Sequence, residues 1–320
     1  MPDYLMLLSP SANRVYAGDA PRLAAAELGA TWPSAGRVEP VRLAGVDYLA
    51  LTAAEDALPT IARQSACFAV FEREGELLRP VALPEVFVLE DDLVSIPKYQ
   101  GKTNEQFTQL LLGVTLAAVT READGNRQVL DPLAGRGTTL STALRMGHDA
   151  FGVELDAKSF EAMAAFYKTY FRRKRIKHTA EITGVKRGGR AIGRRFDLAL
   201  DGQKATVFTG DARDSADLFG KKRFDAIVTD APYGVAHGAT AGGGRDRSPA
   251  ALLTQAIPVW ATQLKHGGAL GISWNTFGLT RDDLAGICRR AGLEVVEHPS
   301  DFAHRVDSSI KRDLLVAVKP

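Results

Sequence analysis

The feature that most constrains this chain is a series of short apolar runs, each followed closely by an acidic residue. The runs QVLD, DAFGVEL, ATVFTGD and FDAIVTD end at or beside Asp131, Glu154, Asp211 and Asp230. Continuous apolar runs with helical segments between them are typical of a sheet covered by helices on both faces. Open parallel sheets bind ligands at the carboxyl ends of their strands. We therefore predict an α/β fold with these acidic side chains gathered at one ligand-binding edge.

The first ninety residues have a different pattern. Tyr4–Ser9 is strand-like, Pro21–Thr31 has helical spacing, and two apolar runs around Ala44-Gly45 indicate a hairpin. A further helical run and a strand-like run complete the order of a ferredoxin-like unit. We predict two domains, a ferredoxin-like α+β domain over residues 1–92 and a larger α/β domain over 93–320.

An amphipathic helix is expected near the start of the larger domain. It spans Thr103 to Glu122, with Thr103 as its cap and Gln106 at the spacing of a capping box.

Composition excludes several classes of protein. Hydrophobic residues make up 45% and charged residues 24% of the chain, and only two cysteines occur, Cys67 and Cys288. Two distant cysteines without neighbouring histidine pairs argue against a disulfide framework or a zinc site and are typical of a reducing compartment. No signal-peptide pattern and no apolar run of about 20 residues is present. We expect a cytoplasmic protein with no metal and no membrane association.

The segment DPLAGRGTT, which starts at Asp131, lies between a strand and a helix. Gly135 and Gly137 allow a sharp turn and the close approach of a ligand, although an isolated Gly-x-Gly is as often only a tight turn. Glu154 is placed to accept hydrogen bonds from ribose hydroxyls, and Asp211 to meet an adenine amino group. A dinucleotide fits less well, because the third glycine is missing and Asp131 would repel a pyrophosphate. S-Adenosylmethionine fits, because it carries an ammonium and a sulfonium group.

The segment after the fourth strand has residues suited to methylation of an exocyclic amine. The Asp230 carboxylate and the Ala231 carbonyl can accept the two amino hydrogens, and Pro232 stiffens the turn. Tyr233 offers a flat face for the target ring. Taken alone, the segment could equally be a surface turn; its position one strand after Asp211 favours the catalytic interpretation.

Several segments of the sequence resemble those of a known family. DPLAGRGTT followed by VTDAPYG resembles the amino-methyltransferases with an Asp/Asn-Pro-Pro-Tyr motif, and among them the tRNA guanine-N2 methyltransferases of archaea and eukaryotes. IPKYQGKTNEQFTQLLLGVTLAA and HRVDSSIKRDLLVAVK resemble further segments of that family, so the likeness spans residue 96 to the end. It implies a Rossmann-like, seven-stranded class I sheet with an antiparallel last strand, S-adenosylmethionine as cofactor, and guanine N2 of tRNA as target.

The resemblance and the patterns above give one set of cofactor-binding residues. They are Thr103, Gln106, Asp131, Leu133, Gly135, Gly137, Thr138, Glu154, Leu155, Asp211, Ala212 and Asp230.

Two departures from the family pattern stand out. Ala231 replaces the second motif residue, a proline, but the required acceptor is a backbone carbonyl. The first ninety residues have room for the ferredoxin-like unit and not for the RNA-binding THUMP domain of the family.

Basic residues gather between Lys168 and Arg195, where eleven Lys or Arg stand against the single acid Glu181. This segment predicts contacts with nucleic-acid phosphates, with tRNA as the expected partner; the alternative is a solvated basic surface. The residues expected to make these contacts are Arg172, Arg173, Lys174, Arg175, and Arg245 and Arg247 of a Gly-rich loop.

Other functions stay open at this stage. DNA adenine-N6 and peptide glutamine methyltransferases use the same type of motif. A nucleic-acid-binding protein with a vestigial methylase site is a further alternative, and Ala231 is the one feature that favours it.

Overall fold

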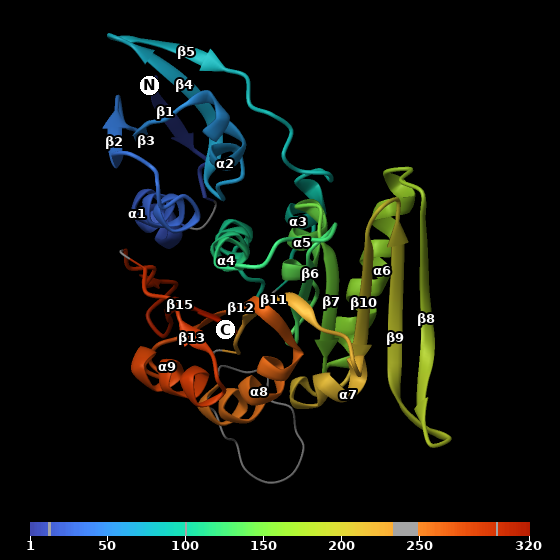
Figure 1. Ribbon diagram of the computed structural model, residues 1–320. Helices are drawn as coiled ribbons and strands as arrows, with labels where there is room; N and C mark the ends of the chain where they lie inside the picture. The colour runs from blue at the N-terminus through green and yellow to red at the C-terminus, as the bar shows by residue number, and fades with distance from the viewer. Residues whose placement is uncertain (12–13, 100, 233–248, 299) are drawn as a thin grey trace.

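The computed structural model describes residues 1–11, 14–99, 101–232, 249–298 and 300–320 (Figure 1). Its strands form two sheets, one of five strands near the N-terminus and one of ten strands.

The first sheet is antiparallel and has the order β2-β3-β1-β4-β5. Its elements are β1 (Asp3–Leu8), α1 (Arg14–Thr31), β2 (Val38–Leu43), β3 (Val46–Thr52), α2 (Leu58–Ala62), β4 (Cys67–Glu74) and β5 (Leu77–Val81). The first four strands and two helices follow the expected ferredoxin-like order, and β5 is an additional edge strand. The β2–β3 turn fits the sequence signal, since Ala44 and Gly45 both have positive φ, at 49° and 85°. The domain boundary at residue 92 stays a prediction.

The second sheet has five parallel strands at its centre. They are β6 (Gln128–Asp131), β7 (Asp149–Glu154), β10 (Lys204–Thr209), β11 (Phe224–Asp230) and β12 (Leu264–Asn275). β15 (Lys311–Val318) lies antiparallel to β12 and pairs with the short strands β13 (Glu294–Val295) and β14 (His304–Arg305). The order β13-β15-β12-β11-β6-β7-β10 gives a Rossmann-like class I sheet and confirms the predicted fold class and the antiparallel last strand.

Helices cover both faces of this sheet (Figure 1). They are α3 (Asp92–Ser95), α4 (Glu105–Ala117), α5 (Thr138–Arg145), α6 (Ala157–Arg173), α7 (Ser215–Phe219), α8 (Pro249–Gln263) and α9 (Arg281–Arg290). Successive residues of a strand point to opposite faces of the sheet. Val129 belongs to the core under α4, α5 and α6, whereas its neighbour Leu130 belongs to the core under α8 and α9.

The larger sheet has a hairpin that was not predicted. β8 (His178–Arg187) and β9 (Arg190–Leu200) form a long hairpin, and β9 pairs antiparallel with β10 at the edge of the sheet. The basic stretch between the second and third parallel strands is therefore largely extended chain.

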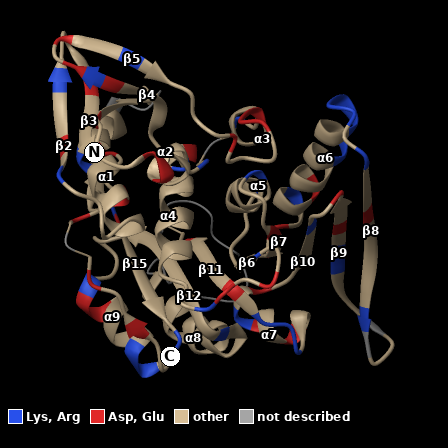
Figure 2. Cartoon of the chain, turned by 45° about the horizontal axis from the view of Figure 1, so that its top comes forward, with Lys and Arg blue, Asp and Glu red and all other residues tan. Residues whose placement is uncertain are grey.

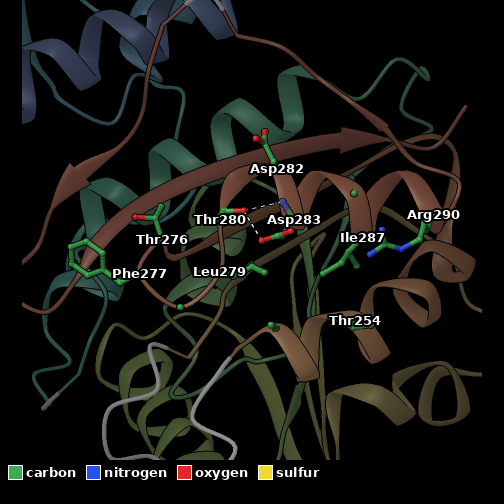
Figure 3. Close-up of a pocket in the computed structure, with 12 residues that line it drawn as sticks. Thr254, Thr276, Phe277, Leu279, Thr280, Asp282, Asp283, Ile287 and Arg290 are labelled. Carbon is green, nitrogen blue, oxygen red and sulfur yellow. Dashed lines mark hydrogen bonds between the residues drawn. The ribbon is translucent and has the colours of Figure 1, made fainter.

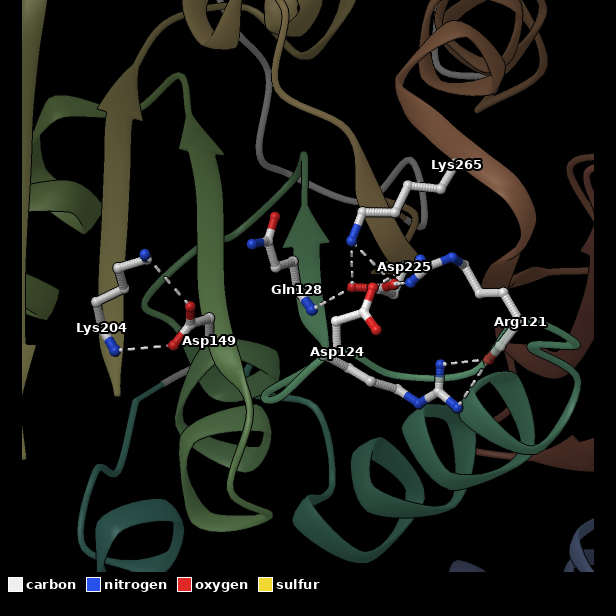
Figure 4. A network of polar contacts seen from close by, with 8 residues as sticks. Arg121, Asp124, Gln128, Asp149, Lys204, Asp225 and Lys265 are labelled. Carbon is white, nitrogen blue, oxygen red and sulfur yellow. Dashed lines mark hydrogen bonds and ion pairs between the residues drawn. The ribbon is translucent and has the colours of Figure 1, made fainter. Parts of the chain in front are cut away.

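Charged residues stabilise the amino edge of the sheet (Figure 4). Asp225, 2% exposed, accepts hydrogen bonds from the Gln128 amide at 2.8 Å, Lys265 Nζ at 2.9 Å and Arg121 Nη1 at 2.5 Å. Burial alone would raise the pKa of Asp225, but the Gln128 amide and the charges of Lys265 and Arg121 lower it. Asp149 likewise accepts a hydrogen bond from the Lys204 amide at 3.1 Å. Acidic groups at this edge are thus compensated.

Within the described ranges, no helix has the length and hydropathy needed to cross a membrane. Across the same residues, no cluster of three or more His, Cys, Asp or Glu side chains is arranged to hold a metal ion.

Candidate functional site

Four acidic residues meet at the carboxyl edge of the parallel strands. β6, β7 and β11 end at Asp131, Glu154 and Asp230, and Asp211 follows the end of β10 by two residues. These strands are adjacent in the order β11-β6-β7-β10, so the spacing in the sequence becomes a continuous edge in space.

The glycine loop joins β6 to α5 and has two residues in the left-handed region. Gly135 has φ 54°, and Gly137, which caps α5, has φ 86°. A Cβ on Gly137 would lie 3.0 Å from both Met163 Cγ and the Tyr167 hydroxyl, whereas a Cβ on Gly135 would meet nothing within 4 Å. Packing therefore explains Gly137, and the open space at Gly135 leaves room for a ligand.

The Glu154 carboxylate holds the loop against the end of β7. It accepts hydrogen bonds from the amides of Gly135 at 2.6 Å and Asp156 at 2.7 Å. Burial outweighs these bonds and raises the pKa of Glu154 to about 7. Leu155 follows with a side chain 56% exposed, an apolar surface beside the carboxylate.

Asp131 is buried at 3% exposure. Its Oδ1 accepts hydrogen bonds from the Leu133 amide at 3.0 Å and the Thr229 hydroxyl at 2.8 Å. Burial raises the pKa of Asp131 to about 6, and the nearby charge of Asp230 acts in the same direction. Among the described residues, no Lys or Arg lies within ion-pair distance of Asp131 or Glu154, in contrast to Asp225 at the amino edge.

Asp211 is already engaged within the chain. Its carboxylate accepts hydrogen bonds from Arg213 Nε at 2.9 Å and Nη2 at 2.6 Å, and these bonds lower the pKa of Asp211. A ligand amino group at Asp211 would share the carboxylate with this guanidinium. Ala212 is buried, and its carbonyl accepts a hydrogen bond from Trp260 Nε1 at 3.0 Å.

Asp230 is held by side chains from three separate segments. Oδ2 accepts a hydrogen bond from the Thr103 hydroxyl at 2.5 Å, and Oδ1 accepts one from the Ser273 hydroxyl of β12. Arg312 of β15, 4% exposed, has Nη2 3.9 Å from Oδ2. Together these contacts fix the orientation of the carboxylate and place a positive charge beside it.

The residues after Asp230 are only partly described. Ala231 is buried at 1% exposure, and its amide donates to the Ser273 carbonyl at 2.8 Å. Pro232 is exposed. Tyr233, and Arg245 and Arg247 of the Gly-rich loop, lie outside the described residues.

The start of α4 corrects the predicted cap. Asn104 is the N-cap, and its side chain accepts a hydrogen bond from the Phe107 amide at 3.2 Å. Thr103 is not the cap, because its hydroxyl donates to Asp230. Gln106 turns away from Asp230, and its Nε2 donates to the Ser9 carbonyl of the N-terminal unit at 3.2 Å.

Sequence reasoning missed several residues around the edge. The Tyr99 hydroxyl lies 2.9 Å from Thr138 Oγ1 at the start of α5, and the Arg136 guanidinium stacks on the Tyr99 ring at 4.9 Å. Ser273 and Arg312 contact Asp230. Tyr99 and Arg312 lie in the family-like stretches IPKYQGKTN and HRVDSSIKRDLLVAVK, whereas the contact of Ser273 with Asp230 depends on which strands are neighbours.

The predicted phosphate-binding residues lie at the end of α6. Arg172, Arg173 and Arg175 are exposed there. Lys174 instead forms ion pairs with Glu90 and Asp92, both at 2.5 Å. Figure 2 shows the concentration of Lys and Arg at this helix end.

A separate cavity of about 500 Å³ lies between α8, α9 and the turn after β12 (Figure 3). Its lining includes Thr254, Asp282, Arg290 and Phe277, the last with a side chain 59% exposed. No predicted site residue in the described ranges lines this cavity.

No protein-family model and no curated protein matches the sequence. Among solved structures, magnesium protoporphyrin IX methyltransferase from Synechocystis, with bound SAM, is 12% identical over 69% of this chain and 87% of its own, with a TM-score of 0.43. The fibrillarin pre-rRNA processing protein of Methanococcus jannaschii is 11% identical over 78% and 93%, with a TM-score of 0.43. Precorrin-6y C5,15-methyltransferase from Geobacter metallireducens is 14% identical over 73% and 98%, with a TM-score of 0.41. Because the sequence identities and TM-scores are low, the fold is assigned from the strand order.

Proposed function

We propose that this chain is an S-adenosylmethionine-dependent methyltransferase that methylates an exocyclic amino nitrogen of a nucleic-acid base, with guanine N2 of tRNA as the favoured target. The observation that carries the proposal is that two of the four acids at the carboxyl edge, unlike Asp211 and Asp230, have no cationic partner among the described residues. Buried acids at the amino edge have Lys and Arg partners, whereas Asp131 and Glu154 at the carboxyl edge have none among the described residues.

A positively charged nucleoside cofactor suits this edge. Asp131 would stabilise the positive charge of the ligand, since an opposite charge favours the ionised carboxylate. Each Glu154 oxygen accepts one amide hydrogen bond and retains a second lone pair for a ribose hydroxyl. Leu155 supplies exposed apolar surface next to that position, and the space at Gly135 lets the ligand approach the backbone.

S-Adenosylmethionine supplies an electrophilic methyl group on a positively charged sulfur. Asp230 would accept a hydrogen bond from the target amine, since a carboxylate oxygen can accept more than one hydrogen bond and the Thr103 and Ser273 hydroxyls already orient this group. The Ala231 carbonyl is the second proposed acceptor. As the nitrogen–methyl bond forms and the carbon–sulfur bond breaks, the amine loses one proton towards Asp230. Positioning and electrostatics account for most of the effect.

Two features support a nucleic-acid substrate. The sequence after Asp230 resembles the Asp-Pro-Pro-Tyr-Gly motif of the tRNA guanine-N2 enzymes, and the chain carries an excess of exposed Lys and Arg between residues 168 and 195. A small-molecule methyltransferase would not require such a basic surface, because phosphate contacts dominate nucleic-acid affinity.

The test is mass spectrometry of nucleosides from tRNA, rRNA and DNA of cells with and without the gene. We expect one methylated guanosine of tRNA to disappear with the gene and to return with the wild-type copy, but not with Asp230→Ala. Loss of N6-methyladenine from DNA, with unchanged tRNA nucleosides, would replace the tRNA proposal with the DNA alternative.

A further inference from the structure

The β8–β9 hairpin extends past the carboxyl edge of the sheet. β9 pairs with β10 from Ala199 to Arg195, and the Arg194 amide then donates to Thr209 Oγ1 at 2.7 Å, at the last residue of β10. The hairpin turns at Gly188-Gly189, and the register between β9 and β10 ends at Arg195, so residues 185–193 pair only with each other among the described residues. We call residues 185–193 the hairpin tip.

The direction of the strands places this tip on the side of the candidate site. β10 is parallel to β7 and antiparallel to β9, so the start of β9 lies at the edge where β7 ends at Glu154 and β10 ends at Thr209, two residues before Asp211. Neighbouring strands are about 4.8 Å apart, which puts β9 about 10 Å from β7. In Figure 1 the tip lies at the lower side of the view. The helix α7, which follows Asp211, lies on the same side.

The end of α6 lies at the opposite edge. α6 starts directly after β7 and runs back along the sheet for 17 residues, a length of about 25 Å. Lys174 accordingly contacts Glu90 and Asp92, which lie away from the glycine loop beside the first turn of α3. Arg172, Arg173 and Arg175 therefore do not lie on the edge that carries Asp230.

Charge and glycine content distinguish the tip. Residues 185–193 contain three basic and no acidic residues, together with three glycines. At the base, Arg194 pairs with Glu161 at 2.8 Å and Arg195 with Asp197 at 2.7 Å. Lys186 is exposed and has no acidic partner among the described residues. At the turn, β8 ends at Arg187 and β9 begins at Arg190. The sequence KRGGR thus combines positive charge with backbone that a phosphate can approach closely.

We propose that the hairpin tip is the arm that holds RNA against the carboxyl edge, through contacts of its Lys and Arg residues with backbone phosphates. This inference rests on the proposed function and specifies which surface binds the substrate. The tip grips the sugar–phosphate backbone, and the target base reaches the site beside Asp230. A basic arm at this edge places the phosphate contacts close to the site. The end of α6 lies at the opposite edge and is too far from the site for this role.

The experiment compares two triple variants that each remove three positive charges. The tip variant is Lys186→Gln, Arg187→Gln and Arg190→Gln; the control is Arg172→Gln, Arg173→Gln and Arg175→Gln at the opposite edge. Fluorescence anisotropy measures binding of unmodified tRNA between 50 and 200 mM salt, calorimetry measures S-adenosylmethionine affinity, and methyl transfer is followed at varied tRNA concentration.

We expect the tip variant to bind tRNA at least about tenfold more weakly at low salt, with a slope of log K against log salt reduced by about 2. Its KM for tRNA rises, while kcat at saturating tRNA and cofactor affinity stay within about twofold. The control should change tRNA binding by less than about threefold. Equal tRNA binding by the tip variant and the wild type, or a larger loss in the control, would overturn the assignment.

Failure of the two proposals can be told apart. If the wild type methylates tRNA and the tip variant does so with the same KM, only the arm is wrong. If tip-dependent tRNA binding occurs without any methyl transfer, the arm stands and the proposed activity fails. A tip-dependent complex with an acidic protein, without affinity for tRNA, would contradict the choice of partner.

Discussion

Raising the pH from 6 to 8 should tighten S-adenosylmethionine binding, because the two carboxyls proposed to face the cofactor bind it in their ionised forms. The pKa of Glu154 is raised to about 7 and that of Asp131 to about 6, both chiefly by burial. Both groups are therefore partly protonated at pH 6 and almost fully ionised at pH 8. A cationic, hydroxyl-bearing ligand favours the ionised form, so affinity increases as the pH rises.

The magnitude follows from the fractions ionised. Glu154 goes from about 9% to about 91% ionised, a gain of about tenfold, and Asp131 adds about twofold. The expected tightening is about 20-fold, and binding at pH 6.5 should release about one proton in total.

Calorimetry in two buffers with different ionisation enthalpies measures both quantities. Glu154→Gln keeps one carbonyl acceptor but does not titrate, so its affinity should change only about twofold over the same range. An affinity that is equal or weaker at pH 8 in the wild type, or a binding enthalpy independent of the buffer, would refute the placement of the cofactor at these two residues.

Three further outcomes are expected. Asp230→Ala should lower kcat at least about 10²-fold and leave S-adenosylmethionine affinity within a few fold, since its proposed contact is with the target amine; full turnover would remove it from the mechanism. Gly137→Ala should lower the melting temperature more than Gly135→Ala, because only the first adds a methyl group 3.0 Å from side-chain atoms; equal melting temperatures would contradict this. Asp225→Asn should cost about 2–3 kcal/mol in urea unfolding, because it removes the buried charge that pairs with Lys265 and Arg121, whereas Asp124→Asn, with a side chain 95% exposed, should cost less than about 0.5 kcal/mol.

Much of the site could be predicted because its residues end strands. Apolar runs that stop at Asp131, Glu154 and Asp230 place acids at one edge as soon as the strands are parallel. The left-handed conformation of Gly135 and Gly137 follows from the same strand-to-helix turn. The antiparallel last strand came with the family resemblance and is confirmed by the pairing of β15 with β12.

Contacts between segments that are distant in the sequence could not be predicted from it. Thr103 and Asn104 are both residue types that cap helices well. The Thr103 hydroxyl donates to Asp230, which lies 127 residues further along the chain, and Asn104 therefore caps the helix. Arg312 meets Asp230 only because β15 lies beside β12. The β8–β9 hairpin was missed because its many Lys, Arg and Gly residues resemble a solvated loop more than a pair of strands.

Asp230 is proposed to lie at a methyl-transfer site for an RNA base amine. The most direct test of this proposal is incubation of the purified protein with methyl-labelled S-adenosylmethionine and an unmodified tRNA pool, followed by nucleoside digestion and mass spectrometry. We expect label in N2-methylguanosine with the wild type and at least about 10²-fold less with Asp230→Ala. Label in another nucleoside, or equal labelling by the two proteins, would contradict the account.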